Sequence, residues 1–195
     1  HSFWVPKLAG KVDMVPSNNN TMWFQADKVG EYFGQCAEYC GSSHANMRFK
    51  VIAVEKPDFD AWLSHQASKA VEHTDPLAKT GAALFKDLGC SGCHSLRTEI
   101  NLKADGSIAK GRVGPNLAHV ASRRHLAAGM LENSNGDGSI NNAYLQNNLR
   151  NWLHDPNNVK PGNIMSSRAQ IYTDPNKSLT EEQLSALVSY LTTLK

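Results

Sequence analysis

Two short cysteine motifs in this 195-residue chain carry residue types that bind metals or haem. The first runs from Cys36 to Met47 with the pattern C-x-x-x-C-x-x-x-H-x-x-M, which gathers two thiolates, an imidazole and a thioether. Sulfur ligands are soft, and this set suits copper best. One alternative is a structural zinc loop, because zinc also takes Cys and His at such spacing, although it gains little from a thioether. A pair of buried free cysteines is the other alternative.

The second motif is Cys90-Ser91-Gly92-Cys93-His94, the C-x-x-C-H pattern of covalent haem attachment. The spacing lets Cys90 and Cys93 form thioethers with the two haem vinyl groups and holds His94 under the iron. A redox-active C-x-x-C would need a βαβ context that the pattern lacks, and a zinc half-site would want a second cysteine pair. Both cysteine pairs lie within the two motifs, so no cysteine remains for a structural disulfide.

Composition narrows the range of functions. Hydrophobic residues make up 41% of the chain, as in ordinary globular proteins, and the formal net charge is +2. A charge this small argues against a nucleic-acid partner and against strong attraction to a membrane surface. No apolar run approaches the roughly 20 residues of a membrane-spanning helix, and no signal peptide is evident.

The first motif stands among predicted strands. Residues 11–15 and 21–26 read as short strands separated by turn residues. Residues 47–54 read as a further strand, with Phe49, Val51 and Ala53 on one face and Lys50, Ile52 and Val54 on the other. Trp23 and Phe24 are expected in the core. The pattern therefore predicts an all-β first part, which ends at Pro57.

The second motif stands among predicted helices. An acidic first turn opens a helix at Asp58, and the polar stretch 66–76 reads as a linker. Apolar residues at helical spacing predict helices over 77–88 and 142–154. A capping box, Thr180 to Gln183, begins the last helix.

The first motif, written C-x-E-x-C-G-x-x-H-x-x-M, resembles the binuclear copper loop, CuA, of cytochrome c oxidase subunit II. The opening segment, residues 1–6, resembles that family's upstream segment. The resemblance implies two copper ions bridged by Cys36 and Cys40. The other ligands it implies are His1, His44, Met47 and the backbone carbonyl of Glu38. It also implies that the Glu38 side chain helps bind a magnesium ion at the interface with subunit I, since magnesium favours carboxylates and waters.

The second motif and its surroundings resemble class I cytochromes c. Gly114-Pro115-Asn116-Leu117 is similar to a turn whose Pro carbonyl accepts a hydrogen bond from the proximal His, here Pro115 and His94. Residues 160–165 resemble the loop that delivers the axial Met, which implies Met165 as sixth ligand. Competing candidates are Met130, His119, His125 and His154. Ser166 follows where many relatives have Pro, which leaves the loop less stiffened. In this family the last helix crosses the first, and Gly81 would permit the close approach.

Two stretches look inserted between these landmarks, residues 98–110 and residues 133–140. The second has alternating oxygen-bearing residues and a Gly turn, like a calcium loop. It lacks an acidic first residue, and Tyr144 occupies the place of the bidentate Glu. We therefore expect an ordinary Asn/Gly loop there.

Together the resemblances imply two domains. An all-β cupredoxin-like barrel, of which this chain holds the C-terminal portion, is expected over residues 1–57, and a helix and linker over residues 58–76. An all-α class I cytochrome c domain is expected over residues 77–195.

The implied function is electron transfer in a bacterial caa-type oxidase, with no catalytic residue in this chain. Electrons would pass from an external donor, a cytochrome c or a quinol-oxidising complex, through haem c to CuA. Subunit I would then receive them and reduce oxygen to water. Expected partners include subunits I and III, and the expected place is the outer face of the bacterial cytoplasmic membrane, anchored by upstream helices.

Two other functions are consistent with the same two motifs. One is a nitrous oxide reductase with CuA and an appended cytochrome, whose loop typically has an aromatic residue where this chain has Glu38. The other is a free-standing CuA and haem c carrier. Residues upstream of His1 would separate the three, since they would be membrane helices, a propeller domain or a bare signal peptide.

Overall fold

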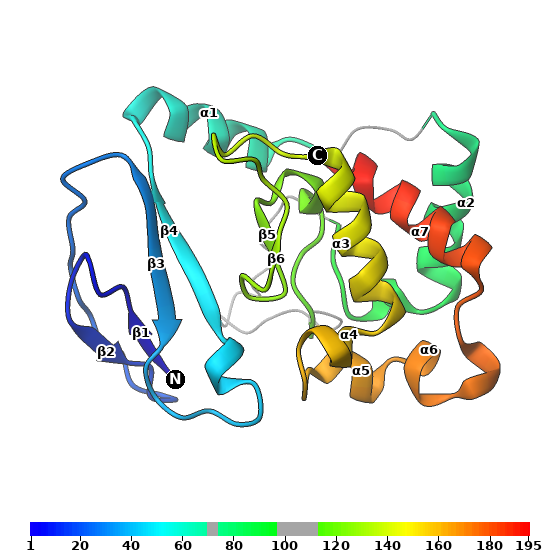
Figure 1. The fold of residues 1–195 in the computed structure, drawn as a ribbon, viewed down its shortest axis with the longest axis horizontal. Coiled ribbons are helices and arrows are strands. Elements are labelled where there is room, and N and C mark those ends of the chain that lie inside the picture. The colour runs from blue at the N-terminus through cyan, green and yellow to red at the C-terminus, as the bar shows by residue number, and fades with distance from the viewer. Residues whose placement is uncertain (70–73, 97–112) are drawn as a thin grey trace.

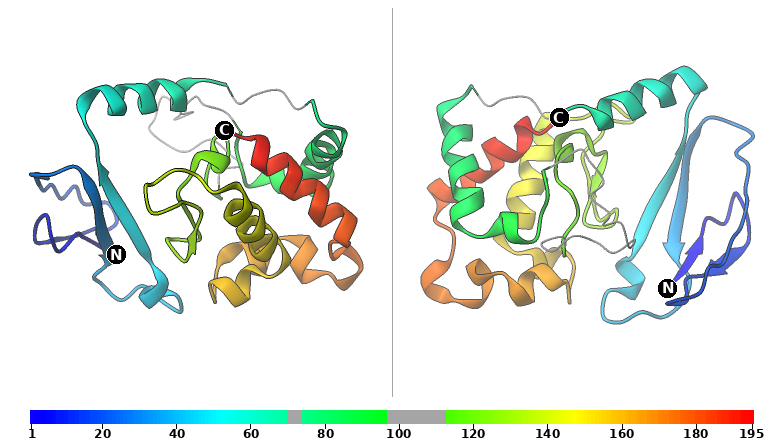
Figure 2. Two further views of the ribbon diagram at one scale, coloured as in Figure 1. Left: turned by 45° about the horizontal axis from the view of Figure 1, so that its top comes forward. Right: turned by 180° about the vertical axis from the view of Figure 1, so that it is seen from behind.

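The computed structural model describes residues 1–69, 74–96 and 113–195. A β-sheet lies at one end of the molecule and a group of helices at the other, and helix α1 (Lys56–Ala67) bridges them along one edge (Figures 1 and 2). We call residues 1–54 the sheet region, and residues 74–96 and 113–195 the helical region. The two cysteine motifs fall one in each region.

The sheet region contains a four-stranded antiparallel sheet in the order β2-β1-β3-β4. Its strands are β1 (Ser2–Trp4), β2 (Lys11–Asp13), β3 (Gly30–Cys36) and β4 (Arg48–Ala53). Half-buried and exposed residues alternate along β4, as the sequence predicts. The sheet is open among the described residues, so the predicted barrel is present only as one sheet.

The predicted strand over residues 21–26 is wrong. This segment has no regular secondary structure, and Trp23 is 84% exposed. Phe24 is 39% exposed and stacks only loosely on Phe3, with ring centroids 6.0 Å apart. An apolar run forms a strand only when another strand offers a hydrogen-bonded ladder, and no described strand pairs with this one. The expected core role of Trp23 is wrong for the same reason.

The predicted helices of the second part are confirmed. Asn141 caps α3 through two backbone N–H groups, and Thr180 and Gln183 form the capping box of α7. Short turns of 3₁₀ helix fill the connections. The remaining helices and turns are α2 (Pro76–Asp87), α3 (Asn142–His154), α4 (Pro156–Val159), α5 (Ile164–Arg168), α6 (Gln170–Thr173), α7 (Glu181–Thr193), η1 (His44–Asn46), η2 (Cys90–Gly92), η3 (Val120–Ser122) and η4 (Pro175–Lys177).

The hydrophobic core lies where α2, α3 and α7 meet. Leu145 and Leu187 are almost fully buried there. Gly81 of α2 lies directly against α7, because a Cβ at this position would overlap the backbone carbonyl of Ala186. The predicted crossing of the first and last helices, with Gly81 at the contact, is therefore confirmed.

The helical region is not purely α-helical, which corrects the all-α prediction. A short hairpin pairs β5 (His125–Leu126) with β6 (Leu131–Glu132). Its turn holds Ala127, Ala128 and Gly129 at φ of 52, 60 and 79°. Strands of two residues carry too little alternation to be read from sequence. In Figures 1 and 2 the hairpin occupies the side of the helical region that faces β4.

Two expectations concern the rest of the chain. The predicted surface loop over residues 98–110 lies outside the described residues, as do residues 70–73 of the predicted linker. Among the helices that the structure describes, none is long and apolar enough to cross a membrane.

Candidate metal and haem sites

The copper-type loop is closed by backbone hydrogen bonds at its two ends. Cys36 is the last residue of β3, and its N–H donates to the carbonyl of Met47 at 2.9 Å. The next N–H, of Ala37, donates to the Ser2 carbonyl at 3.0 Å and ties the loop to β1. Within the loop, Gly41 has φ of +119°, a conformation that favours glycine. These constraints bring the first and last sulfur-bearing residues of the loop together.

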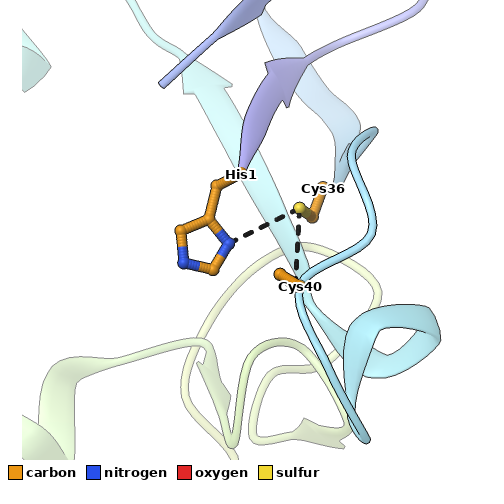
Figure 3. A group of neighbouring side chains, drawn as sticks. All are labelled: His1, Cys36 and Cys40. Carbon is orange, nitrogen blue, oxygen red and sulfur yellow. Dashed lines mark hydrogen bonds between the residues drawn. The ribbon is translucent and has the colours of Figure 1, made fainter. Parts of the chain in front are cut away.

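His1, Cys36 and Cys40 form the one cluster of potential metal ligands found among residues 1–69, 74–96 and 113–195. Their donor atoms all lie within 4.8 Å of one another. Figure 3 shows the sulfur of Cys36 between Cys40 and the His1 ring, which reaches it from the chain terminus. The sulfurs are 3.8 Å apart, and His1 Nδ1 is 3.7 Å from Cys36 Sγ.

Each sulfur has its own pair of further donors. Beside Cys36 Sγ are His1 Nδ1 and, at 3.1 Å, the Glu38 carbonyl. Beside Cys40 Sγ are His44 Nδ1 at 3.5 Å and Met47 Sδ at 3.7 Å. Metal–thiolate bonds are about 2.3 Å for zinc, so one ion of similar size can touch both sulfurs. The structure thus brings together all six predicted donors, which are the two sulfurs and two further donors beside each sulfur.

The two thiols of the sulfur pair differ in pKa. Burial opposes ionisation of Cys36, but hydrogen bonds with the backbone at Glu38 and Ser2 and with the side chains of Cys40 and His44 lower its pKa to about 7. Desolvation and the neighbouring Cys36 raise the pKa of Cys40. Since the thiolate is the form that binds metal, Cys36 is the readier ligand near neutral pH. Metal binding then displaces the proton of Cys40.

Glu38 contacts the sulfur pair through its backbone. Its backbone carbonyl contacts Cys36, while the residue itself is exposed, as is the neighbouring Tyr39. This fits the expectation that only the backbone of Glu38 serves the sulfur cluster. Its suggested magnesium role stays a prediction.

The haem-type motif follows α2 directly. Gly89, at φ of +79°, turns the chain out of the helix into η2, and the N–H of His94 donates to the Cys90 carbonyl at 2.9 Å. Cys90 is half-buried against the core, and this burial raises the pKa of its thiol, while Cys93 is exposed. Both thiols are free, as thioether formation requires.

His94 sits in a fixed orientation. Its Nδ1–H donates to the Pro115 carbonyl at 2.8 Å, the contact expected from the sequence. Gly114 lies against the same ring, and a Cβ at this position would come within 2.5 Å of His94 Cε1. Only glycine leaves room here, so the turn both holds the imidazole and frees Nε2 for an axial bond.

Of the candidates for the opposite axial ligand, Met165 has the most suitable surroundings. It packs on the same core cluster as Cys90, whereas Met130 is 36% exposed beside the hairpin turn. Among the histidines, His125 pairs with Glu132, His119 donates toward the Ser68 carbonyl, and His154 is exposed.

The segment around Met165 is braced by the side chain of Asn163. Asn163 caps α5 by accepting from the Ser166 N–H, and its Nδ2 donates to the carbonyls of Pro156 and Lys160 at 2.8 Å. The expectation of a less stiffened loop overlooked this side chain. Asparagine at a helix N-cap was the signal that could have shown it.

One further group, the guanidinium of Arg123, suits an anionic cofactor and was missed at the sequence level. Arg123 is partly buried, which lowers its pKa, and it donates to the Asn116 carbonyl without forming an ion pair among the described residues. The neighbouring His119 is 5% exposed, and its buried Nδ1 has no hydrogen-bond partner among the residues that the structure describes. A haem carries two propionates, so a half-buried cation beside the His94 turn fits the group.

The loop over residues 133–140 has hydrogen bonds among its own side chains. Asp137 Oδ1 accepts from the N–H and hydroxyl of Ser139 at 2.9 and 2.6 Å, and Asn135 Nδ2 also donates to Ser139. That this is an ordinary loop stays a prediction.

Two known protein families match this chain. Residues 1–54 match the family described as cytochrome c oxidase subunit II, periplasmic domain, and residues 78–195 match cytochrome c. The chain belongs to the cytochrome c family and carries a subunit II periplasmic domain in front. The subunit II domain holds the copper-type loop, and the cytochrome c domain holds the C-x-x-C-H motif.

Relatives with both parts are similar over the whole chain. Proteins named cytochrome c oxidase subunit 2 are 38% identical in Alkalihalophilus pseudofirmus, 40% in Bacillus sp. strain PS3 and 32% in Bacillus subtilis, each covering 100% of this chain. The chain spans about half of these relatives, between 48% and 50% of their length. The combination of a subunit II domain and a cytochrome c domain is thereby confirmed.

Proposed function

We propose that this chain is the electron-transfer part of a respiratory haem–copper oxidase. An external donor gives electrons to haem c, from which they pass to a binuclear copper centre and then to subunit I, where oxygen is reduced to water. Haem and copper each supply a one-electron couple when bound. We also propose the division into a copper domain over residues 1–57, a helix and linker over residues 58–76, and a haem domain over residues 77–195.

The roles of the residues follow from their donors. Cys36, Cys40, His1, His44, Met47 and the Glu38 carbonyl would hold the binuclear copper centre. Thiolates shared between two metals would supply a one-electron couple in which few atoms need to move. Cys90 and Cys93 would hold the haem covalently, and His94 and Met165 would bind its iron, which suits electron transfer. Pro115 orients the ring of His94.

One observation carries the proposal. The copper-type loop touches the segment that leads to Met165, because the Ser43 hydroxyl donates to the Pro161 carbonyl. Gly162 is packed equally closely, since a Cβ there would lie 2.8 Å from Ser42 Cβ. The two donor sets thus belong to neighbouring loops. A short path between a haem and a copper centre supports electron transfer between them.

The assembly is part of the same proposal. The relatives' names support a place in an oxidase, and we propose contacts with subunits I and III on the outer face of the bacterial cytoplasmic membrane. The exposed Glu38 carboxylate is proposed to help bind magnesium at the subunit I interface. Glu38→Gln in the oxidase should leave the copper spectrum nearly intact and weaken binding of manganese as a magnesium probe. A lost copper spectrum with normal manganese binding contradicts this role.

The direct test follows one electron. With both centres loaded, the haem is reduced by a light flash through a photoreductant, and the haem and copper absorption bands are recorded together. We expect the haem to reoxidise at the rate at which the copper centre becomes reduced. A haem that stays reduced beside oxidised copper rules out the proposed route.

A further inference from the structure

We propose that four alternating charges, flanked by a histidine, form a latch that docks the haem-bearing helical region on the sheet region. The residues, in order across the latch, are Arg124, Glu31, Lys50, Glu132 and His125. This inference deepens the proposed function, because the latch holds the loop before Met165 against the copper-type loop.

The contacts of the latch are mutual. Glu31 of β3 accepts from Lys50 of β4 at 2.8 Å through one oxygen and from Arg124 at 2.9 Å through the other. Lys50 also donates to Glu132 of β6 at 3.3 Å, and Glu132 accepts from His125 of β5 at 2.7 Å. Every charge therefore faces its opposite, and two of the pairs cross between the regions.

Two ion pairs of the latch join the two regions. Among residues 1–69, 74–96 and 113–195, Lys50–Glu132 and Arg124–Glu31 are the ion pairs that join the sheet region to the helical region. The described pairs outside the latch, Lys56–Asp60 and Arg150–Glu181, lie within α1 and within the helical region. Electrostatic complementarity of this kind fixes orientation and register between two surfaces.

The hairpin of β5 and β6, which supplies Glu132 and His125 to the latch, lies against the sheet region. Its turn keeps two alanines at positive φ, a conformation that is unfavourable for a residue with a Cβ and persists only where its surroundings hold it. At the tip, Gly129 approaches β4, since a Cβ there would lie 3.6 Å from Arg48 Cβ. The hairpin thus reaches from the helical region onto the sheet.

The latch is open to water, which makes it sensitive to salt. A cavity of about 270 Å³ lies between the regions, lined by Glu31, Lys50, Glu132 and the loop that includes Ser134 and Gly138. The side chains of Arg124 and Glu31 are 32% and 29% exposed. Exposed pairs are screened by salt over about 8–10 Å. Docking is therefore firm at low ionic strength and adjustable at high ionic strength.

The experiment uses the chain with both centres loaded. Arg124→Glu places a carboxylate opposite Glu31, while Arg150→Glu makes the same charge change at a pair inside the helical region, with a similarly exposed side chain. Arg124→Lys keeps the charge. Glu31→Gln removes the same contact from the sheet side, which covers the case in which Arg124→Glu does not fold.

The first readout is hydrogen exchange of the peptides around Ser43 and Gly162, which needs no electron transfer. We expect exchange about tenfold faster in Arg124→Glu, since facing like charges are strongly unfavourable, and near wild-type exchange in Arg124→Lys and Arg150→Glu. High salt should speed exchange in the wild type. Equal exchange in Arg124→Glu, Glu31→Gln and Arg150→Glu overturns the latch.

The second readout is the rate of haem-to-copper electron transfer after a flash. It should fall about tenfold in Arg124→Glu and stay unchanged in Arg150→Glu. If hydrogen exchange becomes faster but the electron-transfer rate is unchanged, the latch is supported. The claim that docking serves electron transfer is then overturned. A wild type without any transfer contradicts the proposed function, and the exchange result still decides the latch.

Discussion

At the scale of residues, the copper-type donors depend on local chain closure more than on distant contacts. The bond from the Cys36 N–H to the Met47 carbonyl fixes the ends of the loop, and a single turn of η1 presents His44. Spacing within one short loop is visible in the sequence. This is why the positions of Cys36, Cys40, His44 and Met47 could be predicted, and why His1, which is distant in sequence, needed the family resemblance.

The choice between Met165 and Met130 gives the first prediction. Met165→Ala should open the sixth haem position, let the reduced protein bind carbon monoxide and lower its reduction potential, because a thioether raises that potential. Met130→Ala is the matched control and should change neither. Carbon monoxide difference spectra and redox titration of both variants provide the measurement. An opened site in Met130→Ala alone would falsify the assignment.

Gly41 gives the second prediction. Its φ of +119° is unfavourable for any residue with a Cβ, although no atom lies within 4 Å of where that Cβ would be. Gly41→Ala should destabilise the copper-type loop by about 1–3 kcal/mol and weaken copper binding. Gly10→Ala, which adds a methyl group in open space without this strain, is the control. Copper titration with equal affinities in both variants would show that the loop tolerates the change.

At the scale of elements, helices were more predictable than strands. The helices α2, α3 and α7 carry apolar faces and caps within their own sequence, so local signals suffice. The segment over residues 21–26 has the composition of a strand but no partner strand in the sheet. The hairpin of β5 and β6 depends on contact with β4, which the sequence around it does not show. Pairing between distant segments therefore limited the prediction.

Gly81 gives the third prediction, at the crossing of α2 and α7. Gly81→Ala should destabilise the protein by about 1–3 kcal/mol, because the new methyl group overlaps the backbone carbonyl of Ala186 and the helices must separate. Gly136→Ala, where a Cβ meets nothing within 4 Å, should have little effect. Denaturant unfolding of both variants measures the difference. A stabilised Gly81→Ala protein would mean that the helices do not cross at this residue.

At the scale of the whole molecule, the relation between the two regions could not be read from the sequence. Neither Glu31 nor Glu132 stands in a motif, and their partners are distant along the chain. The order of the two domains was predictable because each carries its own motif. Their docking depends on surface charges, which composition and spacing leave undetermined.

The latch gives the fourth prediction, a dependence of stability on pH. Burial opposes the effect, but the Ser134 hydroxyl and the charges of His125 and Lys50 lower the pKa of Glu132 from 4.5 to about 2. The ionised form is thus favoured by folding, so its contribution is complete above pH 4.5 and is lost as pH falls toward 2. Because the side chain is 48% exposed, the contribution should stay below about 1 kcal/mol.

Glu132→Gln tests this dependence, since the amide does not titrate. The difference in unfolding free energy between wild type and variant should shrink as pH is lowered from 4.5 to 2. Parallel stability curves over this window would show that Glu132 is not held by the latch.

The most direct test of the account is the metal and haem content of the intact chain. Two donor sets around one sulfur pair and one C-x-x-C-H motif predict two copper ions and one covalent haem per chain. Elemental analysis should give copper and iron in a ratio of two to one. Cys36→Ser should lose copper but keep the haem, and Cys90→Ser should do the reverse. Zinc in place of copper, or a haem that acidic acetone extracts, would contradict the account.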